Sequence, residues 1–216
     1  MSLFLGKVHY WLFNKVVWFE GLEVEIISLA KDTGLDIETL SKEINEKYGA
    51  KLPNVPLESL IDTNNIHSWL QEKIQASEGR MAAWTTKTLN YNKDASFKME
   101  NIYIQQGEKA AKEVHEENLE YSTASDIYNR INDYILDGMP CDRVNEIISS
   151  DESALSWRKN ICTHKDIWNK ETGDVKYFYK LRGMWIKAFV QAINSDFEYV
   201  EEEDGLMLSI NLHKGN

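Results

Sequence analysis

Two cysteines and one histidine are the side chains of this sequence best suited to metal or thiol chemistry. Cys141 and Cys162 are the two cysteines of the chain, and His164 follows two residues after Cys162. Zinc and iron accept thiolates and a neutral imidazole as ligands, with a fourth position left for water or a carboxylate. Cys141, Cys162 and His164 are therefore a candidate zinc or iron site.

A predicted β-hairpin would bring the two thiols together. The polar run around Asp151-Glu152 indicates a tight turn, which would set Glu146 opposite Trp157 and Cys141 opposite Cys162. Side chains alternate along a strand, so a slip of one residue would turn the two thiols to opposite faces.

The same residues have two other interpretations. Cys162 would be a nucleophile if His164 activates it, and the positive neighbours Arg143 and Lys165 would favour the thiolate. In the structural interpretation, Cys141 and Cys162 are small buried apolar residues beside a histidine that caps a strand.

A second candidate cluster comes from a stretch that occurs twice. Residues 8–21 and 66–79 share the ungapped pattern Val/Ile-His-x-Trp-Leu-x-x-Lys-Val/Ile-x-x-x-Glu-Gly. We interpret this pattern as an internal repeat. Its apolar spacing is typical of a helix, and we expect the two helices to lie at the centre of the fold.

The repeat predicts two His–Glu pairs if its copies pack antiparallel. Helical residues eleven apart differ by only about 20° around the axis, so His9 shares a face with Glu20 and His67 with Glu78. Antiparallel packing would bring His9 to Glu78 and His67 to Glu20, as in bundles that hold metals between helices. The alternative is that these histidines are core residues, since neither copy contains His-x-x-x-His or Glu-x-x-His.

Three residues of a predicted amphipathic helix are candidates for binding a substrate. Arg182 interrupts the apolar side of this helix beside Leu181 and Trp185, and Trp185 and Tyr177 are the other two candidates. A guanidinium binds a carboxylate through two parallel hydrogen bonds, so Arg182 would hold an anionic ligand, or else it pairs with Asp174. The sequence contains no phosphate loop, dinucleotide fingerprint or Gly-x-Ser-x-Gly turn.

The segment Gly138–Leu212 resembles the C-terminal part of proteins similar to L-2-amino-thiazoline-4-carboxylic acid hydrolase. The matching residues are Asn160-Ile161-Cys162 and the run from Ala188 to Phe197. The family's closing hairpin tends to carry a second cysteine, whereas Met207–Leu212 has none. The resemblance implies a cysteine-assisted hydrolase of small cyclic amides or thiazolines, with Cys162 as the residue carried over.

Composition narrows the class of protein. The 216 residues are 43% hydrophobic and 27% charged, with seven Trp and ten Tyr, as expected of a globular chain rich in aromatic packing. A net charge of −11 argues against a nucleic-acid partner. With two cysteines and no apolar run near the ~18 residues that span a bilayer, we expect no membrane partner and a cytoplasmic location. The acidic run Glu201–Asp204 is expected to be a solvated turn.

These elements predict an α+β fold that is mainly α. Residues 1–138 should form a helical bundle and residues 139–216 a hairpin–helix–hairpin, together one domain over 1–216. We expect helices over 5–32, 36–48, 66–91, 97–119, 122–135 and 174–194, and strands over 143–148, 154–161, 197–200 and 206–212.

These features lead to two hypotheses about function and one about dimerisation. The first is a small-molecule hydrolase or metal-binding protein that uses the Cys/His cluster. The second is a non-catalytic ligand-binding or sensor module with an aromatic pocket, for which Trp11, Trp69, Trp185 and Tyr177 are the candidate lining. The apolar first helix would also suit a homodimer.

Overall fold

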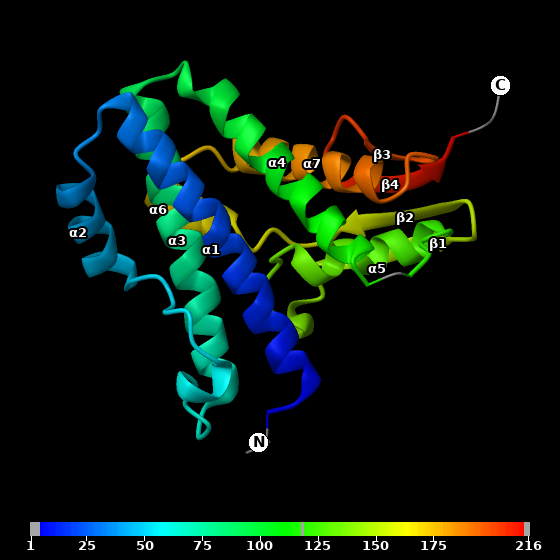
Figure 1. Ribbon diagram of the computed structural model, residues 1–216, viewed down its shortest axis with the longest axis horizontal. Coiled ribbons are helices and arrows are strands. Elements are labelled where there is room, and N and C mark those ends of the chain that lie inside the picture. Colours follow the sequence, from blue (N-terminus) through cyan, green and yellow to red (C-terminus); the bar gives the residue numbers. More distant parts are fainter. Residues whose placement is uncertain (1–4, 118, 214–216) are drawn as a thin grey trace. The chain divides into compact units, whose positions relative to one another are not determined.

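A computed structural model describes residues 5–117 and 119–213 and shows an α+β fold that is mainly α, as predicted (Figure 1). None of its described helices is long and apolar enough to cross a membrane. The elements are α1 (Lys7–Thr33), α2 (Ile37–Tyr48), η1 (Leu57–Ser59), α3 (Ile66–Tyr91), α4 (Ala95–His115), α5 (Ala124–Tyr134), η2 (Pro140–Asp142), β1 (Asn145–Ser150), β2 (Ala154–Lys159), α6 (Lys165–Lys170), α7 (Val175–Ile193), β3 (Phe197–Glu201) and β4 (Met207–Leu212).

The chain divides into two compact units, each built from three segments. Unit 1 comprises Met1–Lys98, Tyr134–Met139 and Thr163–Val175, and unit 2 comprises Met99–Asp133, Pro140–Cys162 and Lys176–Asn216. The division does not fall at residue 138, where the sequence changes from helical to mixed character. The single-domain expectation remains a prediction.

Helix ends in unit 1 lie close to where the capping residues predicted them. α1 ends at Gly34, which adopts the left-handed conformation (φ 96°) and donates its N–H to the carbonyls of Ala30 and Lys31. α2 begins after Asp36, whose carboxylate accepts the N–H of Thr39 at 3.2 Å. On the solvent side of α1, Val17 and Val24 are each 45% exposed, and dimerisation through this helix remains a prediction.

α1 and α3 pack parallel, not antiparallel (Figure 1). The rings of His9 and His67, near the starts of the two helices, lie with their centroids 5.5 Å apart. Further along, Arg80 of α3 pairs with Glu20 and Glu23 of α1. The expected His9–Glu78 and His67–Glu20 pairs are therefore wrong, because corresponding ends of the two copies face each other.

The connection between the two helices accounts for their parallel arrangement. Parallel neighbours need a crossover that returns the chain to its starting end, whereas a tight loop gives antiparallel ones. Here α2 and the segment 49–65, which contains η1, make that return. The ring of Tyr48 then packs on Gly79, where a Cβ would lie only 2.3 Å from it.

In unit 2 the four strands form one antiparallel sheet with the order β1-β2-β4-β3. Trp157 of β2 pairs with Leu208 of β4, and Leu155 pairs with Ile210. These four side chains are buried. The two predicted hairpins are thus confirmed and join through β2 and β4.

The register of the first hairpin differs from the prediction. Glu146 pairs with Arg158, not with Trp157, and a β-bulge lies between Ile147 and Ser149. The bulge places one extra residue on β1, so the pairing with β2 shifts by one residue partway along the strand. The β1–β2 pairing begins at Asn145 and Lys159, and Cys141 lies before it in η2. The predicted pairing of Cys141 opposite Cys162 is therefore wrong.

α4 and α7 lie side by side in unit 2 (Figure 1). A Cβ on Gly107 of α4 would sit 2.4 Å from the carbonyl oxygen of Trp185, so only glycine allows this approach. The predicted apolar side of α7, from Phe178 to Ile193, is buried. α4 was expected to reach residue 119 but ends at His115, and residue 118 lies outside the described residues.

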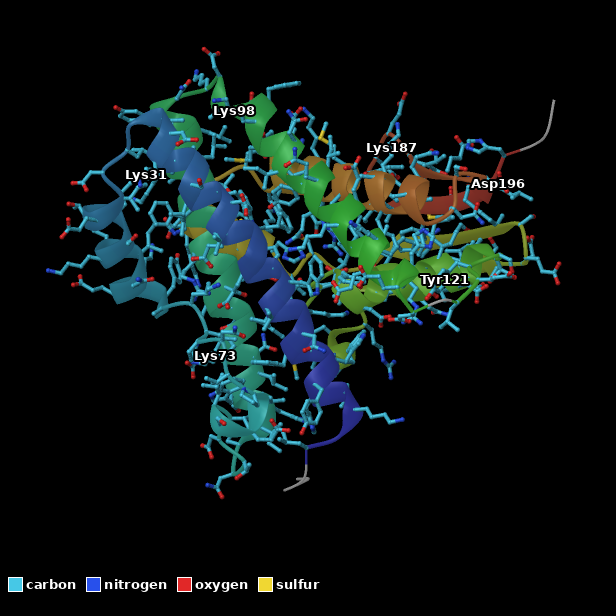
Figure 2. The ribbon with its side chains drawn as sticks, in the orientation of Figure 1. Lys31, Lys73, Lys98, Tyr121, Lys187 and Asp196 are labelled. Carbon is cyan, nitrogen blue, oxygen red and sulfur yellow. The ribbon has the colours of Figure 1, made fainter. Side chains whose placement is uncertain are left out.

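Two hydrogen bonds in unit 2 hold the end of α7 and the end of β4 in place. Asn194 donates its amide N–H to the Tyr121 carbonyl at 2.9 Å, and the backbone N–H of His213 donates to the Asp196 carbonyl at 2.7 Å. Tyr121 and Asp196 are labelled in Figure 2. These contacts tie the end of α7 and the end of β4 to the rest of the unit.

Candidate functional site: a charged cleft beside Cys162

Unit 2 contains a cleft of about 720 Å³ beside Cys162. The end of β2, the first turns of α7 and the turn between β3 and β4 form it. A volume of this size is typical of small-molecule sites. Its lining residues are Lys159, Asn160, Ile161, Cys162, Lys176, Tyr179, Lys180, Glu201, Glu202, Glu203, Asp204, Gly205 and Leu206.

Cys162 lies in the cleft with a phenol against its sulfur. Tyr179 Oη donates a hydrogen bond to Cys162 Sγ at 3.2 Å. Lys159 Nζ lies 4.0 Å from the centre of the Tyr179 ring, which is a cation–π contact. Cys162 is exposed and in no disulfide, so a solute can reach it. A donated hydrogen bond favours negative charge on sulfur, and the thiolate is the reactive form.

Lys159 also links the Tyr179 ring to a carboxylate that lines the cleft. Its Nζ lies 3.9 Å from Glu201 Oε1, and Tyr199 Oη donates to Glu201 Oε2 at 3.3 Å. Burial, and then the Glu201 charge, raise the pKa of Tyr199, so this phenol stays protonated and remains a donor. The backbone N–H of Lys159 donates to the Leu206 carbonyl at 2.9 Å, which fixes the end of β2 against the β3–β4 turn.

Two groups of opposite charge line the cleft. We call Lys176 and Lys180, on one side of α7, the lysine face, and the run Glu201–Asp204 the acidic turn. Lys180 Nζ lies 2.6 Å from Glu100 Oε1. The acidic turn is exposed, as predicted, but it also borders the cleft, which the sequence did not indicate.

A smaller cavity of about 20 Å³ adjoins the cleft through shared residues. Lys159, Tyr179 and Glu201 line both, and Arg182 and Tyr199 line only the smaller one. Arg182, the predicted carboxylate-binding residue, therefore contributes to a narrow space next to the cleft.

The other two predicted substrate-binding residues line neither space. Trp185 is buried, stacks on Phe189 with ring centroids 5.2 Å apart, and donates its indole N–H to Gln106 Oε1 at 2.9 Å. Tyr177 is half-buried, and burial together with the charge of Glu100 raises its pKa to about 12.

The residues of the expected aromatic pocket lie in both units. Trp11 and Trp69 belong to unit 1, whereas Tyr177 and Trp185 belong to unit 2. The ammonium of Lys15 lies 3.4 Å from the Trp11 ring centre, and that of Lys73 (Figure 2) lies 5.4 Å from the Trp69 ring centre.

The structure does not bring Cys141, Cys162 and His164 together as metal ligands. In residues 5–117 and 119–213, no three His, Cys, Asp or Glu side chains form a group that would hold a metal ion. Both cysteines are exposed. His164 is fully buried in unit 1, where both ring nitrogens face carboxylates.

His164 lies between Glu78 and Asp137 in the core of unit 1. Nδ1 is 3.1 Å from Glu78 Oε2, an ion pair without hydrogen-bond geometry, and Nε2 is hydrogen-bonded to Asp137 Oδ1 at 3.1 Å. Burial alone would lower its pKa, but the Glu78 charge and the Asp137 hydrogen bond outweigh it and raise the pKa to about 9. His164 is therefore an imidazolium at neutral pH and has no lone pair for a metal or a thiol proton.

Glu20, the other predicted acid, belongs to a separate buried cluster in unit 1. Arg80 Nη2 donates to Glu20, and Arg80 Nε donates to Glu23 Oε1 at 2.9 Å. The backbone N–H of Leu52 donates to both Glu20 oxygens at 3.2 Å. Burial raises the pKa of Glu20 and Glu23, and Arg80 partly offsets this. Because the guanidinium and both carboxylates bind one another or the backbone, we assign the cluster a structural role.

His9, the remaining candidate, helps to start α1. Its Nδ1 accepts the backbone N–H of Gly6 at 2.8 Å. Burial, and then the proximity of His67, lower the pKa of His9. A neutral imidazole is the form that accepts this hydrogen bond, so His9 acts as part of the helix cap.

Two residues of the cleft, Lys159 and Tyr179, were not predicted from the sequence as functional residues. Tyr179 shares a side of α7 with Lys176 and Lys180 through the i, i+3, i+4 spacing, and this polar stripe opposite the apolar one was the available signal. For Lys159 the signal was its place at the end of a strand next to Cys162.

No protein-family model, no curated protein and no solved structure matches this chain. The resemblance to thiazoline hydrolases remains a prediction, carried by Asn160-Ile161-Cys162 and the run 188–197.

Proposed function

We propose that unit 2 binds a small polar molecule in the cleft beside Cys162 and that the thiol acts on it. The observation that carries this proposal is the 3.2 Å hydrogen bond from Tyr179 to Cys162 Sγ in the wall of a 720 Å³ cleft. An exposed sulfur that accepts a hydrogen bond is an environment in which thiols react, and here the donor's ring also contacts the Lys159 ammonium.

The chemistry that fits these groups is addition of sulfur to a carbonyl or imine carbon. The Sγ–carbon bond forms while the π electrons move to the heteroatom, which takes a proton from the Tyr179 hydroxyl. The tetrahedral adduct then collapses: its C–N or C–S bond to the leaving amine or thiol breaks, the leaving group takes a proton from solvent, and Tyr179 regains its own proton as the double bond re-forms. Water attacks the thioester or thioimidate that remains, the sulfur leaves as the thiolate, and the proton released from the water goes to solvent. The net reaction is hydrolysis, which agrees with the class of reaction that the thiazoline hydrolase resemblance implies.

This mechanism does not use His164. The imidazole is fully buried and bound on both sides by Glu78 and Asp137. Tyr179 is the polar partner of Cys162 Sγ among the described residues. We therefore assign the proton transfer to Tyr179.

Protection of Cys162 from alkylation tests the proposal. In a Cys141→Ser background, a library of small polar metabolites is screened for compounds that slow the reaction of Cys162 with iodoacetamide, followed by mass spectrometry. We expect at least one class to protect the thiol and to be consumed by the Cys141→Ser protein but not by the matched Cys162→Ala variant. A library in which nothing protects Cys162 would refute ligand binding in the cleft.

A non-catalytic binding module is the second candidate. It is favoured by the absence, among residues 5–117 and 119–213, of a second polar group bonded to Sγ that would act as a base. In that case the protecting compounds bind the Cys162→Ala variant as tightly as the parent protein, and no product appears.

The two exposed thiols, neither in a disulfide, support a reducing compartment such as the cytoplasm.

A further inference from the structure

We infer that the ligand of the cleft is a small zwitterion, whose carboxylate binds at the lysine face and whose ammonium binds at the acidic turn. The inference rests on the proposed function, because it names the chemical class of the molecule that enters the same cleft. It depends on three features: two carboxylates without a counter-charge, two exposed lysines and an apolar strip between them.

Two of the four carboxylates of the acidic turn, those of Glu202 and Glu203, carry charge that the described protein does not compensate. Within the described part of the chain, the carboxylates of Glu202 and Glu203 have no ion-pair or hydrogen-bond partner. Their backbone is nevertheless ordered: Glu202 N–H donates to Met207 O at 3.0 Å, and Gly205 N–H donates to Glu202 O at 2.8 Å. Adjacent like charges repel each other, and an ammonium bound between them relieves that repulsion.

The lysine face presents ammonium groups that a ligand carboxylate can recruit. Lys180 has a side chain 54% exposed in its pair with Glu100, whose side chain is 18% exposed. An ammonium carries three N–H donors, so Lys180 can bind a ligand carboxylate while it keeps its contact with Glu100. Lys176 lies in the first turn of the 19-residue helix α7, where the helix dipole also favours an anion.

A zwitterion fits both sides, whereas a singly charged molecule fits one. A simple amine would be attracted to Glu202 and Glu203 but repelled by Lys176 and Lys180, and a simple acid would meet the reverse. Between the two sides, Ile161 and Leu206 are 52% and 50% exposed and border the cleft. Their side chains provide a surface for the methylene groups that separate the two charges.

Matched ligands that differ only in charge test the inference. Dissociation constants are measured by ligand-observed NMR for 5-aminopentanoate, pentylamine and pentanoate with the full chain. We expect 5-aminopentanoate to bind about tenfold more tightly than either control, as one additional favourable contact would give. Glycine, 6-aminohexanoate, Gly-Gly and Gly-Gly-Gly then separate an amino-acid-sized ligand from a peptide-sized one.

Variants that remove charge from the cleft test which side binds each end of the ligand. The double variant Glu202→Gln, Glu203→Gln should bind 5-aminopentanoate only as tightly as the parent protein binds pentanoate. The double variant Lys176→Gln, Lys180→Gln should bind 5-aminopentanoate only as tightly as the parent protein binds pentylamine. The control is Glu198→Gln with Lys187→Gln, which changes two exposed residues outside the cleft lining (Lys187 is labelled in Figure 2). We expect it to leave the affinity unchanged.

The outcomes distinguish this inference from the proposed function. If pentylamine or pentanoate binds as tightly as 5-aminopentanoate, or protects Cys162 better, the zwitterion is refuted while ligand binding stands. If neither these probes nor the metabolite library protects Cys162, the proposed function itself is refuted.

Discussion

His164 Nδ1 lies 3.1 Å from Glu78 Oε2 in the core of unit 1, with Asp137 on the other side of the ring. Two carboxylates hold one imidazolium away from water, so proton binding by His164 is coupled to folding. The pKa of about 9 in the folded protein stands above the ordinary value of 6.5. A group with a raised folded pKa contributes its stability below the unfolded pKa and loses it as the pH rises through the folded one.

We predict that the protein becomes less stable between pH 6.5 and 9, by an amount on the order of 3 kcal/mol for this one group. Urea denaturation at a series of pH values measures the slope. His213→Gln, an exposed control, should keep it, whereas His164→Gln should flatten it. Because that variant leaves Glu78 buried without a counter-charge and is at risk of unfolding, ¹⁵N chemical shifts of the ring at pH 7.5 provide a second measure. Shifts of a neutral imidazole would contradict the prediction.

Replacing Arg80 should destabilise unit 1 strongly. Arg80→Met leaves Glu20 and Glu23 buried without their cation, and loss of one partner of a buried pair costs about 3–5 kcal/mol. The free energy of unfolding in urea is the measurement, and Lys31→Met, at an exposed position at the end of α1 (Figure 2), is the matched control. Adding Glu20→Gln and Glu23→Gln to Arg80→Met should recover part of the loss. A loss below about 1 kcal/mol would place this cluster among ordinary surface pairs.

His9 should titrate in the opposite sense to His164. Burial and His67 lower its pKa in the folded protein, so its contribution to stability is present above pH 6.5 and is lost as the pH falls. Removing the neighbouring ring in His67→Ala should raise the pKa of His9 part of the way back, because burial, the larger cause, remains. Proton NMR of the imidazole Hε1 follows both. An unchanged His9 titration in the variant would show that the ring contact has no electrostatic effect.

Tyr179→Phe should slow alkylation of Cys162. The variant removes the hydrogen bond to Sγ but keeps the ring under Lys159, and one such bond contributes about 0.5–1.5 kcal/mol, or roughly two- to tenfold in rate. The second-order rate constant with iodoacetamide, read by mass spectrometry, is the measurement. Cys141 in the same protein is the internal control, since it is exposed in η2 and should react at the parent rate. Equal slowing of both thiols would point to a general effect on the fold.

Local chemistry made the helix ends in this sequence predictable. Gly34 ends α1 because glycine adopts the left-handed conformation without strain, and Asp36 starts α2 because its carboxylate accepts a free N–H. The six-residue helix α6 was missed, since a stretch this short does not establish a period.

Long-range geometry was not predictable in the same way. The bulge between Ile147 and Ser149 changes the register without a marker in the sequence. Cys162, predicted as a nucleophile or metal ligand, lines the cleft, and His164 was assigned to the same site because it is close in sequence. Its partners Glu78 and Asp137 come from distant segments, and only the folded chain brings them to the ring.

α4 starts in one unit at Ala95 and continues in the other from Met99 without a break. Three segments of unit 1 alternate with three of unit 2 along the chain. Consequently no single cut of the gene releases either unit whole, and a fragment that keeps Cys162 with all of its sheet must also carry Thr163–Val175. Any transplant of the cleft to another scaffold has to replace that stretch with a designed bridge between Cys162 and Lys176.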